Sequence, residues 1–108
     1  MTRCVFLISV LLSLLTGPAR ADAIDGTWCA GDGRSMTIDG PTIHTPTGDT
    51  LTGEYSRHAF RYLGAPGGAE EAYDVRMRLW SEDELRIDRL VDGIAQPQET
   101  WHRCEPVA

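Results

Sequence analysis

The chain has 108 residues, with sixteen acidic side chains and ten basic ones, all arginine, which gives a formal net charge of −6 with neutral histidines. This acidic balance argues against sequence-independent binding to nucleic acid or to anionic membranes, because both require positive charge on the protein. A chain of this length has room for one small domain.

The first 21 residues have the layout of a secretory signal peptide. A positive start at Arg3 is followed by an apolar run from Cys4 to Leu15 and by a small-residue pattern that ends at Ala21. The run is shorter than the roughly 20 residues that span a bilayer, which favours cleavage over an uncleaved anchor. We therefore expect residues 22–108 to form a single mature domain, periplasmic or secreted, without stable membrane insertion. Its eight arginines and sixteen acids would give a charge of −8.

Two cysteines, Cys29 and Cys104, remain in the expected mature domain. In an oxidising compartment an even number of cysteines in a short chain predicts a disulfide bond. Closing a loop of this length contributes about 4.5 kcal/mol in the chain-entropy treatment. The alternatives are a redox or nucleophilic cysteine and thiolate ligation of a metal. However, the sequence has no Cys-x-x-Cys, and two cysteines alone do not complete a four-ligand zinc site.

The first half of the domain predicts short strands that alternate with turns. Met36 and Ile38 share one face of a short strand, and the following Asp39-Gly40-Pro41 predicts a hairpin turn. A second turn is expected over residues 45–50. The segment 51–63 predicts one strand with a bulge near Ser56, where the apolar positions change from odd to even numbers. Residues 64–68 predict a loop rich in glycine.

The second half contains the clearest strand, over residues 72–80. Its apolar side chains alternate with charged ones and line one face: Tyr73, Val75, Met77 and Leu79. A turn over 81–84, a strand over 85–91 and a last strand over 94–104 follow, and Pro97 indicates an edge position or a bulge in the last one. Six to eight such strands predict an all-β fold, a small antiparallel meander or barrel closed by one disulfide. A sandwich of two sheets is the alternative.

A Thr-Trp pair lies close before each cysteine of the mature domain. In a regular strand Trp28 and Cys29 face opposite sides, and so do Trp101 and Cys104, which are three residues apart. If the first and last strands are neighbours, both cysteines share one face and both tryptophans the other. The pattern therefore predicts a covalent link between the two ends. The alternative, in which His102 activates a Cys104 thiolate, requires a free thiol.

Two groups of residues are candidates for binding. The first is a possible ligand pocket in the barrel interior, formed by His58, Phe60, Tyr62 and Trp101. Because His58 shares even positions with Phe60 and Tyr62, we expect it to point inward, as a core histidine or as a polar group in the pocket. The second is a possible anion-binding stripe of Arg57, Arg61, Arg76 and Arg78, since guanidinium groups suit carboxylates and phosphates. Its alternative is cross-strand pairing with acids such as Glu54, Asp74, Asp88 and Glu99.

The three histidines, His44, His58 and His102, fall in three separate predicted strands and have no paired spacing. We therefore predict no metal site and no cofactor, and we nominate no catalytic residue. A metal-binding protein or an enzyme that uses these three histidines is the alternative function.

Gly26-Thr27-Trp28 resembles the Gly-x-Trp start of lipocalin-like barrels, although the chain is far shorter than ordinary lipocalins. Taken whole, the segments IDGTWC, DGRSMTIDGP, GEYSRHAFRY and TWHRC resemble an uncharacterised family of small exported proteins from high-GC proteobacteria. This resemblance implies export and a disulfide, and it supplies no activity. We expect a non-catalytic protein that binds a small molecule or an envelope protein.

Overall fold

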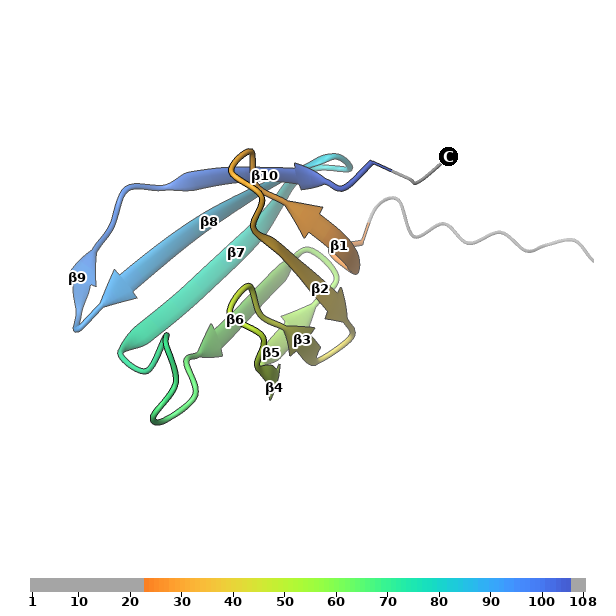
Figure 1. Ribbon diagram of the computed structural model, residues 1–108. Coiled ribbons are helices and arrows are strands. Elements are labelled where there is room, and N and C mark those ends of the chain that lie inside the picture. The colour runs from red at the N-terminus through yellow and green to blue at the C-terminus, as the bar shows by residue number, and fades with distance from the viewer. Residues whose placement is uncertain (1–22, 106–108) are drawn as a thin grey trace, which may run out of the picture.

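The computed structural model describes residues 23–105, and all of their regular secondary structure is β-strand (Figure 1). The expected signal peptide, residues 1–21, lies outside the described residues. No helix in the described part of the chain is long and apolar enough to cross a membrane. The strands are β1 (Gly26–Cys29), β2 (Ser35–Asp39), β3 (Thr42–His44), β4 (Thr50–Thr52), β5 (Glu54–Ser56), β6 (Ala59–Leu63), β7 (Tyr73–Ser81), β8 (Glu84–Val91), β9 (Ile94–Ala95) and β10 (Glu99–Arg103).

The structure has ten strands rather than the six to eight expected, because predicted strands are divided. The segment 51–63 is broken at Gly53, between β4 and β5, and again by the turn before β6. A Cβ atom at Gly53 would lie 2.4 Å from the Phe60 ring and 2.5 Å from the Arg61 carbonyl oxygen, so the bend requires glycine. Pro97, which cannot donate a ladder hydrogen bond, lies in the break between β9 and β10.

The strands form one antiparallel sheet in the order β4-β3-β2-β1-β10-β8-β7-β6-β5, with β9 paired to β8. The strands at the two ends of this order, β4 and β5, are consecutive in the chain and separated only by Gly53. The sheet therefore curls back on itself and is nearly closed into a barrel (Figure 1). The predicted all-β antiparallel barrel is confirmed, and the structure is not the alternative sandwich.

The barrel interior is filled by apolar side chains from every long strand. Two of the three tryptophans, Trp28 and Trp101, are fully buried among them, whereas Trp80 is exposed. The full set is Ile24, Trp28, Met36, Ile38, Ile43, Phe60, Tyr62, Val75, Met77, Leu85, Ile87 and Trp101. A guanidinium group lies over each of the two buried indoles, Arg103 at 4.3 Å from the Trp28 ring centroid and Arg34 at 5.1 Å from that of Trp101.

The predicted disulfide joins Cys29 to Cys104, with a Cα–Cα distance of 5.0 Å. It forms because β1 pairs with β10, which places Cys29 opposite His102 and Trp28 opposite Arg103. Both cysteines are half-buried outside the core that holds the tryptophans, as the alternation predicted. The bond thus links the first strand of the barrel to the last.

Candidate functional site

One end of the barrel contains a cavity of about 550 Å³. Four charged side chains line it, Arg34, Glu70, Arg89 and Glu99. The remaining wall is largely apolar and comes from the turns and strand ends around the opening: Pro46, Ala69, Tyr73, Val91 and Pro97. A concave, mostly apolar space with a few convergent polar groups is the usual form of a small-molecule site.

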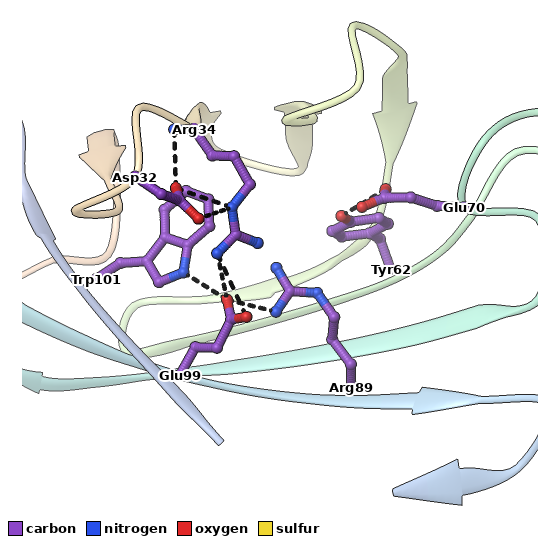
Figure 2. A network of polar contacts seen from close by, with 7 residues as sticks. All are labelled: Asp32, Arg34, Tyr62, Glu70, Arg89, Glu99 and Trp101. Atoms are coloured by element: carbon purple, nitrogen blue, oxygen red, sulfur yellow. Dashed lines mark hydrogen bonds and ion pairs between the residues drawn. The ribbon is translucent and has the colours of Figure 1, made fainter. Parts of the chain in front are cut away.

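Glu99 is the centre of a polar network on one wall of the cavity (Figure 2). Its Oε1 accepts hydrogen bonds from Arg89 Nη1 at 2.7 Å and from the Trp101 indole nitrogen at 2.9 Å. Arg34 Nη2 lies 3.3 Å from the same oxygen, and Asp32 holds the Nε of Arg34 at 2.9 Å. Burial raises the pKa of Glu99, but the hydrogen bonds from Trp101 and Arg89 and the positive charges outweigh burial, so the pKa lies below its usual value. Glu99 is therefore an ionised anchor for two arginines.

Glu70 occupies the opposite wall, in the loop between β6 and β7. Its side chain is almost fully buried, and the Tyr62 hydroxyl donates a hydrogen bond to Glu70 Oε1 at 2.9 Å. Burial, together with the neighbouring Glu70 charge, raises the pKa of Tyr62 well above its usual range, so the phenol remains a donor. Gly64 allows the loop to fold this closely, because a Cβ at Gly64 would lie 1.5 Å from the Glu70 carbonyl oxygen.

Arg89 and Glu70 are both buried and carry opposite charges, yet they do not contact each other. Figure 2 shows the Arg89 guanidinium between the Glu99 network and the Tyr62–Glu70 pair. Among residues 23–105, the Arg89 side chain has one hydrogen-bond partner, Glu99, and the Glu70 carboxylate has one, Tyr62. No ion pair within 4.0 Å joins Arg89 to Glu70. N–H donors of the first and an oxygen of the second therefore have no partner among the described residues.

The four residues predicted to form one ligand pocket do not line a common cavity in the structure. The expectation that His58 points inward is wrong, because the turn between β5 and β6 breaks the alternation and leaves His58 exposed. Phe60 packs in the core and does not line the cavity. Tyr62 and Trp101 are buried and contribute indirectly, since they hydrogen-bond the two carboxylates that line the cavity.

The predicted anion-binding arginines lie on the outer face of the barrel or in a turn. Arg61 and Arg76 both bond Asp74, at 2.9 Å each, so the cross-strand alternative describes these two. Their hydrogen bonds hold the pKa of Asp74 well below its usual range. Arg57 lies in the exposed turn after β5, and Arg78 is exposed on β7. None of the four lines the cavity.

The three histidines are not brought together. His44 lies on β3 and bonds the Thr50 hydroxyl oxygen through Nδ1 at 3.0 Å, while His102 lies on β10, which β2 and β1 separate from β3. The part of the chain that the structure describes contains no group of three metal-ligating side chains. The thiol that a His102–Cys104 pair would need is consumed by the disulfide.

The two arginines and two glutamates of the cavity were not nominated as site residues from the sequence, although the positions of Arg89 and Glu99 indicate that they point inward. Arg89 has the same parity as Leu85 and Ile87, which places a charged side chain on the inner face of β8. Glu99 likewise shares the parity of Trp101 on β10. Glu70 belongs to an irregular loop, so no periodicity indicates its direction.

Searches against protein-family models, curated proteins and solved structures gave no significant match.

Proposed function

We propose that the chain is a non-catalytic binding protein that holds a small polar molecule in the cavity at the end of its barrel. One observation carries the proposal: buried Arg89 and buried Glu70 line the same cavity without contacting each other. A buried charge is costly unless it is paired and hydrogen-bonded. A ligand that contacts both side chains offsets this cost, and small barrels are wide enough to hold one small ligand.

We infer that this binding takes place in the periplasm or outside the cell. The signal-peptide layout of residues 1–21 supports export. A disulfide bond is compatible with the oxidising conditions of these compartments. The ligand is accordingly a molecule of the cell envelope or of the surroundings.

Native mass spectrometry of the protein purified from its own envelope tests the proposal. We expect a small-molecule adduct that is lost on denaturation. The variant Ala69→Trp, which places an indole at an exposed position of the cavity wall, should lose the adduct. The matched control is Ala95→Trp, an exposed alanine on β9 that does not line the cavity, and it should retain the adduct.

Two results contradict the proposal. One is an adduct that survives the Ala69→Trp substitution, which would locate the binding elsewhere. The other is a wild-type protein that carries no adduct even after incubation with the small-molecule fraction of the envelope.

A further inference from the structure

Resting on the proposed function, we infer that the ligand is a small zwitterion, with a carboxylate that binds Arg89 and an ammonium group that binds Glu70. An α-amino acid and a short peptide with free ends share this chemistry. The inference follows from two buried, incompletely paired charges that line the cavity and from the apolar side chains in the same wall.

Arg89 supplies the anion-binding end. A guanidinium has five N–H donors in a planar fork that matches a carboxylate, and only one hydrogen bond, to Glu99, involves the Arg89 side chain within residues 23–105. The single negative charge of Glu99 is shared with Arg34, which lies 3.3 Å away. The positive charge of Arg89 is thus only partly neutralised, and a second carboxylate completes its coordination.

Glu70 supplies the cation-binding end. Its side chain is 4 % exposed, and its one side-chain hydrogen bond in the described residues comes from a neutral phenol, Tyr62. No arginine or histidine of the described chain lies within ion-pair distance of it. The sequence has no lysine that could serve instead. An ammonium group brings both the missing charge and the hydrogen-bond donors for the remaining carboxylate oxygen.

The apolar side chains of the cavity wall suit an apolar ligand body. Tyr73, Val91 and Pro97 present carbon surface to the cavity. Its volume of about 550 Å³ lies within the usual range for small-ligand sites, roughly 300–1,000 Å³. The cavity therefore has room for one amino acid or a short peptide with an aliphatic or aromatic side chain.

Titration of ¹⁵N-labelled protein, followed by backbone amide shifts, tests the inference. The common L-amino acids are added first in small pools at millimolar concentration, together with dipeptides of leucine and phenylalanine. The best binder is then compared with its methyl ester, which lacks the carboxylate, and with its N-acetyl derivative, which lacks the ammonium group. We expect shifts at cavity residues and an affinity loss of about tenfold or more for each derivative. The relative affinity of amino acid and dipeptide distinguishes the two sources.

Two variants test whether Arg89 recognises the carboxylate of the ligand and Glu70 its ammonium group. In Arg89→Gln the parent zwitterion and its ester should bind equally, and in Glu70→Gln the zwitterion and its N-acetyl derivative should bind equally. The glutamine oxygen of Glu70→Gln still accepts from Tyr62, which preserves the fold. The control Arg78→Gln, on the exposed face of β7, should keep the full preference.

Two results would overturn the inference, and they differ from the failure of the proposed function. Equal affinity of the zwitterion and its derivatives for the wild-type protein would show that the cavity binds another chemical class. So would the absence of shifts with every zwitterion while the native protein carries an adduct. If no small molecule occupies the cavity at all, the proposed function itself fails.

Discussion

At the scale of single residues, Glu99 is the carboxylate on which the polar network of the cavity converges. It accepts hydrogen bonds from Trp101 and Arg89 and lies within ion-pair distance of Arg34. Trp101 belongs to the core, whereas Arg89 belongs to the cavity, so Glu99 connects packing to the candidate binding site. Removing its charge should affect both stability and the position of Arg89.

The variant Glu99→Gln should lower the free energy of unfolding by about 2 kcal/mol, because hydrogen bonds to charged groups contribute roughly 1.5–3 kcal/mol and Glu99 is only partly buried. Urea denaturation measures this change. The control Glu54→Gln breaks an exposed pair with Arg61 and should change stability by less than about 0.5 kcal/mol. Equal effects of the two substitutions would show that the Glu99 network contributes no more to the free energy of unfolding than an exposed ion pair does.

The ionised carboxylates predict how stability depends on pH. The pKa values of Asp74 and Glu99 are both lowered in the folded protein, from ordinary values of 3.8 and 4.5. At acid pH the unfolded chain therefore binds more protons than the folded one. The stabilisation is complete above these ordinary values and is lost as the pH falls below them through the folded pKa values. Urea denaturation at a series of pH values should show this fall, and Asp74→Asn should make it shallower.

At the scale of elements, the bend at Gly53 closes the barrel. It lets β4 pair with β3 while β5 pairs with β6, so one stretch of chain contributes to both ends of the sheet. The space for a side chain at this bend is taken by Phe60 and by the backbone of Arg61.

The variant Gly53→Ala should therefore lose about 2–3 kcal/mol of stability, as expected for overpacking, or fail to fold. Gly31→Ala is the matched control, since a Cβ at Gly31 meets nothing within 4 Å. This control should be neutral or slightly stabilising. Thermal unfolding of both variants measures the difference, and an unaltered melting temperature in Gly53→Ala would contradict the role of the bend.

Alternation along single strands explains how much of this architecture could be predicted. The period of two in β7 predicted its buried face, because that face depends on neighbouring residues only. The disulfide was predicted from two cysteines in a domain expected to be exported and from their parity relative to Trp28 and Trp101. The prediction for His58 was wrong because a turn interrupts the alternation of the strand. No glycine or proline between Ser56 and Phe60 indicates this turn in the sequence. Glu70 was missed because loop direction depends on packing, here the close approach of Gly64 to the Glu70 backbone.

At the scale of the whole molecule, the Cys29–Cys104 bond joins the first and last strands across a sequence separation of 75 residues. The double variant Cys29→Ser/Cys104→Ser should lose about 4 kcal/mol of stability, because its unfolded chain is no longer constrained. In urea denaturation, the double variant and the reduced wild-type protein should have the same free energy of unfolding. A double variant as stable as the oxidised wild type would show that strand pairing alone holds the two ends.

The binding cavity unites these features, and a crystal structure of the protein purified from the cells that produce it naturally tests its role most directly. We predict a bound small molecule within hydrogen-bond distance of both Arg89 and Glu70, with Arg89 still bonded to Glu99. A cavity that has closed so that Arg89 and Glu70 form a direct ion pair with each other would contradict the account.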